Sequence, residues 1–191
     1  DRGEKGPLSA DVSPSVLLIA GGAGGLDEET LNRSRPLVKT ALRFFKGKVI
    51  SGGTVSGIPG CVGEISAQLA SRNEKKFELV GYICKTLPHD APRDKRYYDH
   101  IVCGEGDFSP VQLLRSWQDL LAEGVRPHQV LVLGFGGGPL SGAEYHLGLA
   151  LGASVAIAAG SGGAADALIE DPIWTGTPNL YPMPADPATL R

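Results

Sequence analysis

Glycine-rich loops are the part of this chain best suited to chemistry. Three clusters each follow a short apolar run and precede a segment with helical patterning; they are Gly21-Gly22-Ala23-Gly24-Gly25, Ser51-Gly52-Gly53-Thr54-Val55-Ser56-Gly57 and Gly134-Phe135-Gly136-Gly137-Gly138. Glycine accepts positive φ and has no side chain to hold a ligand away from the backbone. The N–H groups of such a loop and of the next helix can therefore face an anion, usually a phosphate. Three loops at equivalent positions predict a nucleotide-sized pocket at one edge of a parallel sheet.

Hydroxyl and carboxyl groups add to these loops. Thr54 and Ser56 lie in the second cluster, where their hydroxyls could bond to phosphate or ribose oxygens. Glu144, in the expected first turn of the helix after the third cluster, could bind ribose hydroxyls or assist glycosidic cleavage. The residues predicted to bind ligand are Gly22, Ala23, Gly24, Gly25, Gly52, Gly53, Thr54, Ser56, Gly57, Gly136, Gly137, Gly138, Leu140, Ser141 and Glu144.

Other polar residues allow both a functional and an ordinary interpretation. Glu64 and Asp166 are candidates for ligand contact or for solvated helix positions, and His146 is better explained as a helix-face histidine than as a base. A fourth turn, Gly160–Gly163, could complete a phosphate cradle. The irregular segment Leu87–His100 is favoured as a solvated loop, although it could supply cations or stacking rings; these are Arg93, Lys95, Arg96, Tyr97 and Tyr98.

Strand and helix patterns alternate along the chain and position these loops. Strands are predicted at 16–20, 48–50, 78–84, 101–103, 130–133 and 155–159. Helices are predicted after Asp27, with Pro36 kinking or dividing the helix, at 58–71, after Ser109, at 142–151 and at 163–169. This alternation predicts a Rossmann-like three-layer α/β sandwich with a mostly parallel central sheet. Residues 1–13 are expected to form a linker or tail, and 14–191 a single domain.

Composition excludes several classes of protein. The chain has 191 residues, 42% hydrophobic and 20% charged, with a net charge of −3, so it lacks the basic excess of a nucleic-acid binder. No apolar run approaches the roughly 20 residues of a membrane span. Cys61, Cys84 and Cys103 have no metal-ligand spacing, which predicts no metal site and a reducing, cytoplasmic setting. The start at Asp1 suggests a fragment of a longer protein.

These motifs carry a resemblance to a known group of proteins. The chain resembles the SLOG superfamily over roughly residues 16–191, and it is most similar to the prokaryotic TRPM-like (LSDAT) branch. The resemblance is carried by the run Ile50–Ile58 with Gly63-Glu64 and by the first and third glycine clusters. The resemblance implies a Rossmann-like sensor domain for a nucleotide-derived ligand such as ADP-ribose or an NAD derivative. It also implies signalling to a fused or partner effector. We expect a homodimer, and no cofactor beyond that ligand.

An enzymatic alternative comes from a distantly related group, the lysine-decarboxylase-like (LOG) phosphoribohydrolases, which cleave nucleoside monophosphates and carry P-G-G-x-G-T-x-x-E. Gly137, Gly138 and Glu144 match this pattern, whereas Leu140 and Ser141 replace its last glycine and its threonine. The catalytic arginine of that group has only Arg115 as a counterpart. Sensing is therefore favoured over N-glycosidase activity, in which Glu144 would be catalytic. A degenerate domain that only mediates assembly is a third possibility. Ordinary NAD-dependent dehydrogenase chemistry is disfavoured, because the third glycine of G-x-G-x-x-G is missing.

Overall fold

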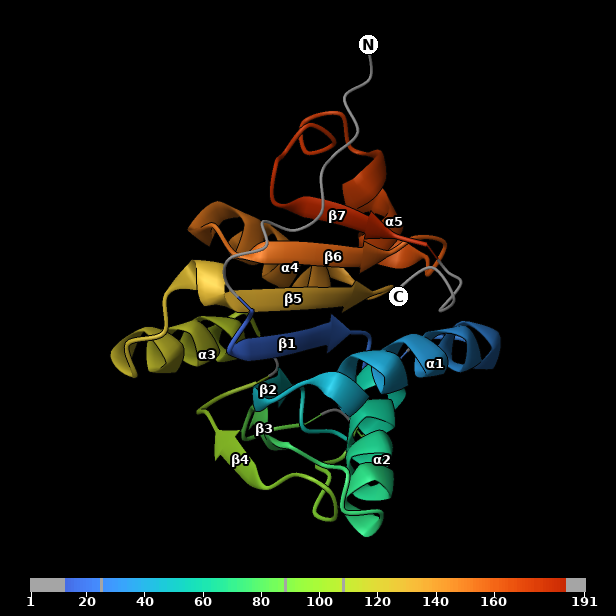
Figure 1. Ribbon diagram of the computed structural model, residues 1–191, viewed down its shortest axis with the longest axis vertical. Helices are drawn as coiled ribbons and strands as arrows, with labels where there is room; N and C mark the ends of the chain where they lie inside the picture. Colours follow the sequence, from blue (N-terminus) through green and yellow to red (C-terminus); the bar gives the residue numbers. More distant parts are fainter. Residues whose placement is uncertain (1–12, 25, 88, 108, 185–191) are drawn as a thin grey trace.

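The computed structural model describes residues 13–24, 26–87, 89–107 and 109–184. Within these residues the chain forms one seven-stranded, all-parallel sheet in the order β4-β3-β2-β1-β5-β6-β7 (Figure 1). The strands are β1 Val16–Gly21, β2 Gly47–Ser51, β3 Phe77–Ile83, β4 His100–Cys103, β5 Val130–Phe135, β6 Ser154–Ala158 and β7 Leu180–Met183. The α-helices are α1 Glu28–Phe44, α2 Gly57–Ser71, α3 Val111–Ala122, α4 Pro139–Leu151 and α5 Gly163–Glu170, and a short 3-10 helix, η1, covers Pro127–Gln129.

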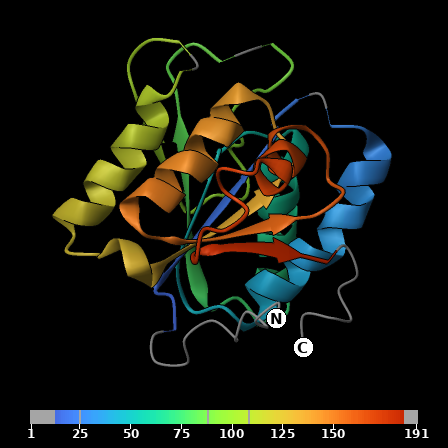
Figure 2. The ribbon, with the colours of Figure 1, turned by 90° about the horizontal axis from the view of Figure 1, so that it is seen from above.

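Both faces of the sheet are buried, as strand β1 illustrates. Leu17 and Ile19 point into a core shared with α1 and α2. Val16, Leu18 and Ala20 point into a second core shared with α3, α4 and α5. Figure 2 shows α1 and α2 on one side of the sheet and α3 and α4 on the other. The predicted three-layer α/β fold is confirmed, because successive residues of a strand alternate between its two faces.

The order of the strands reverses beside β1. This strand pairs with β2 on one side and with β5 on the other, so the chain first builds the sheet outward to β4 and then returns to β5. Ligands of open α/β sheets bind at such a switch point, outside the carboxyl ends of the strands. The three glycine clusters follow β1, β2 and β5 and therefore lie near this position.

The helix boundaries agree with the predicted ones in part. Asp27 caps α1 as predicted, accepting a hydrogen bond of 2.6 Å from the Thr30 N–H. Pro36 does not divide α1, whose flanking residues Leu37 and Val38 are held in the core. Helix α4 begins at Pro139, three residues earlier than predicted, because proline suits the first turn, where no intrahelical acceptor serves its missing N–H.

Helix α3 turns Trp117 and Leu120 toward the sheet, whereas Leu114 and Leu121 are 56% and 50% exposed. Strand β7 was not predicted from the sequence, because only Leu180 is buried in it and Pro182 interrupts its run of strand-forming residues. A proline is tolerated there because β7 lies at the edge of the sheet. The expected tail, 1–13, lies almost wholly outside the described residues.

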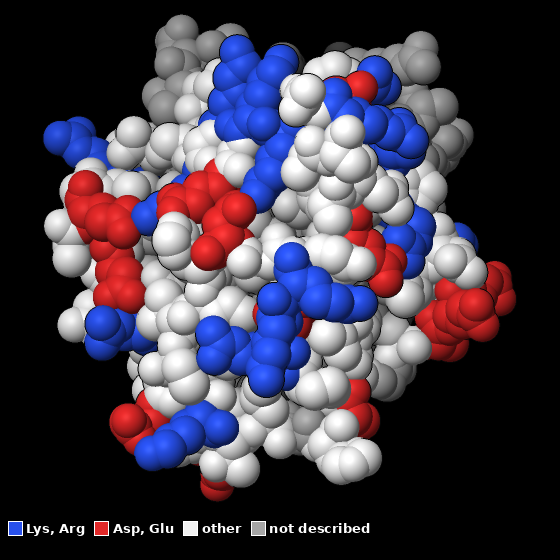
Figure 3. Space-filling view, turned by 90° about the horizontal axis from the view of Figure 1, so that it is seen from below, with Lys and Arg blue, Asp and Glu red and all other residues white. Residues whose placement is uncertain are grey.

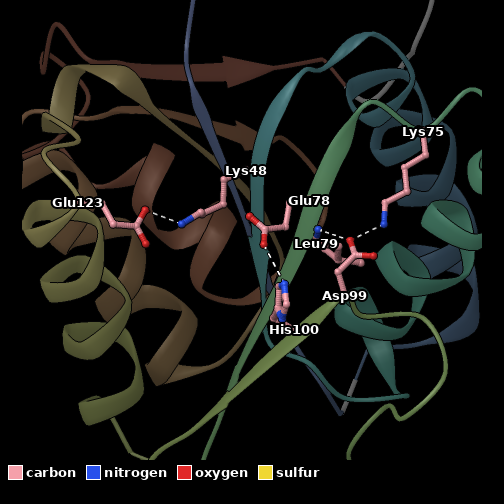
Figure 4. Close-up of polar contacts among 7 residues, drawn as sticks. All are labelled: Lys48, Lys75, Glu78, Leu79, Asp99, His100 and Glu123. Atoms are coloured by element: carbon pink, nitrogen blue, oxygen red, sulfur yellow. Dashed lines mark hydrogen bonds and ion pairs between the residues drawn. The ribbon is translucent and has the colours of Figure 1, made fainter.

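Charged side chains pair at the amino ends of β2, β3 and β4, the end of the sheet opposite the glycine loops (Figure 4). Lys48 on β2 pairs with Glu123, which follows α3. Glu78 on β3 lies 3.1 Å from the His100 ring on β4. Asp99 binds Lys75 and accepts a 2.7 Å hydrogen bond from the Leu79 N–H. Figure 3 shows basic and acidic side chains interspersed on one face of the molecule. Within the described ranges, no helix has the length and apolar character needed to span a bilayer.

Candidate functional site

A cavity of about 290 Å³ lies at the carboxyl ends of β1 and β2. Its walls come from the loop after β1, the loop after β2, the helices α3 and α4, and three residues of the segment after β3, which are Leu87, Asp90 and Ala91. This volume is near the lower end of the roughly 300–1,000 Å³ typical of ligand pockets. The predicted pocket therefore has a physical counterpart at the switch point of the sheet.

Many of the predicted ligand-binding residues surround this cavity. Those that line it are Gly22, Ala23, Gly24, Gly52, Thr54, Gly138, Leu140, Ser141 and Glu144. Those that do not line it are Gly53, Ser56, Gly57, Gly136 and Gly137. Gly25 lies outside the described residues. The glycines outside the cavity have structural roles.

Gly57 joins the first two loops. Its φ is +60°, and a Cβ atom added there would lie 2.0 Å from the Gly22 carbonyl oxygen. This close approach lets the Ile58 N–H donate a 3.0 Å hydrogen bond to Gly22. Because Pro59 has no N–H and Gly60 donates to the Ser56 carbonyl, the amino terminus of α2 offers little to an anion. The second glycine cluster thus shapes the cavity more than it donates to it.

Residues 90–94 form a wall beside the second loop. The Val55 N–H donates to the Pro92 carbonyl at 3.0 Å, and the Asp94 N–H donates to the Gly53 carbonyl at 2.9 Å. The Ser56 hydroxyl donates to the Asp90 carbonyl at 2.7 Å. The favoured interpretation of a solvated loop is wrong for this part of Leu87–His100, because Leu87, Asp90 and Ala91 line the cavity.

The cations and rings of the same segment point elsewhere. Arg93, Lys95 and Arg96 are exposed, and Arg96 pairs with Asp94. The Tyr98 hydroxyl donates to the Pro59 carbonyl at 2.9 Å. None of these residues, nor Tyr97, lines the cavity.

The third glycine cluster, Gly134–Gly138, has residues that stabilise the fold and a residue that lines the cavity. The Gly136 N–H donates to the Ser161 hydroxyl at 2.9 Å, and the Gly137 carbonyl accepts from the Ala164 N–H at 2.8 Å. These bonds hold the end of β5 against the start of α5. From Gly138 onward the chain faces the cavity.

The fourth glycine turn does not complete a phosphate cradle. Asp166 accepts 2.8 Å hydrogen bonds from the N–H groups of Gly160 and Gly162, so the turn is closed by its own carboxylate. Glu64 pairs with Arg35 at 2.9 Å on the surface. His146 contacts the Gly142 carbonyl and the Trp174 ring, consistent with a helix-face position.

Backbone N–H groups from two segments remain as donors at the cavity. Those of Ala23 and Gly24 in the first loop, and of Leu140 and Ser141 in the first turn of α4, have no acceptor among the described residues. The first N–H groups of any helix lack intrahelical acceptors and carry the positive end of its dipole. Two separate segments therefore bring unpaired amides to one cavity.

Glu144 is the most unusual titratable group of the site. It lies in the second turn of α4, not the first, because the helix starts at Pro139. Burial raises the pKa of its carboxyl to about 8. Among the described residues its carboxyl has no hydrogen-bond or ion-pair partner. Glu144 is therefore predominantly neutral at pH 7 and can both donate and accept a hydrogen bond.

The described lining of the cavity contains no lysine or arginine. Arg115, the counterpart of the LOG arginine, lies outside it and pairs with Asp119 at 2.9 Å on the surface of α3. The Asp90 carboxylate lies over Gly24, 3.0 Å from the position of an added Cβ. A ligand with several phosphates would thus meet the Asp90 carboxylate without compensating cations.

Sequence reasoning missed the contribution of α3 and β3. Gln112, Leu113 and Ser116 of α3 and Tyr82 of β3 line the cavity. The Tyr82 hydroxyl donates a 3.1 Å hydrogen bond to an Asp119 carboxylate oxygen, and burial raises the pKa of Tyr82. A signal was present, because Gln112 and Ser116 are four residues apart and share the inward side of a helix that also buries Trp117 and Leu120.

Solved structures of the same fold were found, whereas no protein family and no curated protein matches the chain in sequence. The X-ray structure of TM1055 is 17% identical, with a TM-score of 0.61 over 92% of this chain and 96% of that one. The molybdenum cofactor carrier protein of Chlamydomonas reinhardtii is 15% identical, with a TM-score of 0.60 over 92% of both chains. The molybdenum cofactor binding protein of Rippkaea orientalis is 15% identical, with a TM-score of 0.59 over 95% and 94%.

These likenesses concern the fold. The neighbours share the three-layer α/β fold of this chain. The resemblance to the SLOG superfamily and to its TRPM-like branch stays a prediction. Identities of 15–17% leave ligand and activity to be argued from the cavity.

Proposed function

We propose that this chain binds a small phosphorylated, nucleotide-derived ligand and acts as a sensor of it. The observation that supports this most is the meeting of unpaired N–H groups from the first glycine loop and from the start of α4 at one cavity. Amides from two segments can surround one phosphate without any lysine or arginine.

The volume favours a ligand the size of a nucleoside monophosphate. At about 290 Å³ the cavity is small for ADP-ribose or NAD, which would have to extend through its opening. The electrostatics agree, because the Asp90 carboxylate lines the cavity and no cation of the described lining balances a second phosphate. Ligands with one phosphate group are therefore the first candidates, followed by ADP-ribose and NAD derivatives.

The output of the sensor would be a shift in population between conformations of the domain. A ligand changes such an equilibrium only by the difference in its affinity for the two states. The first loop is the natural point of coupling, because Gly22 is bound to the start of α2 while its neighbours line the cavity. In this proposal the shift passes through a homodimer or to a fused or partner effector.

A carrier role is supported by two of the structural neighbours, which are described as a molybdenum cofactor carrier and a molybdenum cofactor binding protein.

An N-glycosidase of the LOG type is favoured by one feature, the neutral Glu144 carboxyl in the cavity. The position of Arg115 outside the cavity weighs against hydrolysis. Release of free base from a nucleoside monophosphate, abolished by Glu144→Gln, would establish N-glycosidase activity.

The binding proposal is tested by titration calorimetry with AMP, IMP, UMP, ADP-ribose and NAD. We expect at least one monophosphate to bind more tightly than ADP-ribose and NAD. Mass spectrometry of small molecules released from the purified protein runs beside it, and it would also reveal a molybdenum-containing ligand. If no nucleotide binds and none is released, the sensor proposal is wrong.

Gly138→Ala is predicted to weaken ligand binding while leaving the fold intact. A Cβ atom at Gly138 meets no protein atom within 4 Å, and its φ of −99° suits alanine, so folding is not strained. The added methyl group would nevertheless face the ligand at the start of α4, where the phosphate is expected. We expect about tenfold weaker binding, equivalent to ~1.4 kcal/mol, with an unchanged melting temperature of the free protein. Unchanged affinity would place the phosphate elsewhere.

A further inference from the structure

Helix α3 carries an apolar stripe on the side that faces away from the sheet. Val111, Leu114 and Leu121 are each at least half exposed, and they make up three of the six large apolar side chains exposed among the described residues. With the exposed Gln118 between them, they follow one another at intervals of three, four and three residues, which places all four on one side of the helix. This spacing is the one by which a helix packs against a second helix.

Helix α4 lies on the same side of the sheet and has an outer surface without charge (Figure 2). Its one charged residue is Glu144, which lines the cavity. A helix that is apolar on all sides is normally buried on all sides. The outer surfaces of both helices therefore form one apolar face, which we call the α3–α4 face. It consists of Val111, Leu114, Gln118 and Leu121 from α3, and of Ala143, Leu147, Ala150 and Leu151 from α4.

The order of side chains along α3 indicates that a second copy of the chain covers this face. A two-fold interface joins identical surfaces, so residue i contacts residue j of the other copy and residue j contacts residue i. In an antiparallel pair of α3 helices centred near Gln118, Leu114 of each copy lies against Leu121 of the other. Gln118 then meets its own counterpart, and an amide can both donate to and accept from an identical amide. The stripe is complementary to itself.

The charges beside the stripe and the position of α4 agree with such a pairing. Arg115 and Asp119 lie along one edge of the stripe and pair with each other at 2.9 Å, so neither brings an unpaired charge to the contact. One helix offers too little surface for a stable interface, which takes about 800 Å² from each partner. A two-fold axis that crosses α3 within the plane of contact also sets α4 of one copy against α4 of the other.

We propose that the α3–α4 face is the interface of a homodimer, in which α3 packs antiparallel to α3 of the second copy with Gln118 near the two-fold axis. This interface does not depend on which ligand the cavity binds. The same two helices line the cavity through Leu113 and Leu140, so a ligand that shifts them would change the strength of dimerisation. Only this last step rests on the proposed function.

Sedimentation velocity of the full chain without ligand, over a range of concentrations, tests the interface. We expect the wild type to form dimers. Leu114→Lys and Leu121→Glu, made singly, each set a charge against an apolar side chain and should weaken dimerisation by about 100-fold or more. The double variant Leu114→Lys/Leu121→Glu sets opposite charges against each other across the antiparallel pair, and should recover about tenfold or more of that loss.

Phe44→Lys is the matched control. Phe44 is 74% exposed at the end of α1, on the other side of the sheet, and its replacement should leave dimerisation unchanged. Circular dichroism should show the wild-type fold for every variant, because the replaced side chains are exposed. This measurement separates loss of the dimer from loss of the fold.

The opposing outcomes are distinct from a failure of ligand binding, which calorimetry measures separately. A wild type that stays monomeric at every concentration would overturn the interface. A dimer that survives both single variants, or that Phe44→Lys weakens equally, would show that another surface holds the copies together. A double variant no tighter than the single variants would overturn the antiparallel pairing of α3.

Discussion

Gly57→Ala is expected to destabilise the protein by about 3 kcal/mol. The φ of +60° at this position costs an alanine roughly 1–2 kcal/mol. The new Cβ would also lie 2.0 Å from the Gly22 carbonyl oxygen, which would break the 3.0 Å Ile58–Gly22 hydrogen bond, worth about 1 kcal/mol. Urea unfolding should show a lower midpoint at an unchanged slope.

The matched control is Gly176→Ala. Gly176 is exposed, its φ is not positive, and a Cβ added there meets nothing within 4 Å. We expect its stability to stay within about 0.5 kcal/mol of the wild type. Gly57→Ala should in addition weaken nucleotide binding, because Gly22 would move with its loop. Equal stability of the two variants would contradict the described contact between the loops.

Glu144→Gln is expected to be more stable than the wild type at alkaline pH. The ordinary pKa of a glutamate is 4.5, and burial raises that of Glu144 to about 8 in the folded protein. Between these values the unfolded chain is ionised while the folded protein stays protonated, so the wild type loses stability as the pH rises. Each pKa unit corresponds to 1.36 kcal/mol, and partial exposure to the cavity reduces the full effect. We expect a gain of about 2 kcal/mol at pH 9 and none at pH 4.

Denaturant unfolding at pH 4, 7 and 9 measures this difference. Glu105→Gln serves as the control, because the Glu105 side chain is 91% exposed and does not line the cavity. Parallel stability profiles of Glu144→Gln and the wild type would show that the Glu144 carboxyl is solvated. The same ionisation should weaken binding of a phosphorylated ligand above about pH 8, because a carboxylate then faces the anion. Glu144→Gln should lack that decline.

The alternation of apolar runs and glycine turns was enough to predict the fold. Val16–Ala20 is apolar at every position, which suits a strand buried on both faces, and the structure buries it between the two cores. The Asp27 cap could also be predicted from local sequence, because the Asp27 side chain binds an N–H only three residues further along the chain. Strand β7 escaped prediction because its order comes from pairing with β6, which short-range patterns do not encode.

The residues of the cavity also differ in whether the local sequence could identify them. Gly22, Gly138 and Glu144 were identified because loops that follow parallel strands must emerge at one edge of the sheet. Which glycines face a ligand depends on contacts distant in the chain, such as Gly57 against Gly22 and Gly137 against Ala164. Gln112 and the raised pKa of Glu144 also arise only when α3 and α4 cover the same face. Local sequence specifies backbone conformation and strand ends, whereas burial and unpaired groups are created by packing between segments far apart in the chain.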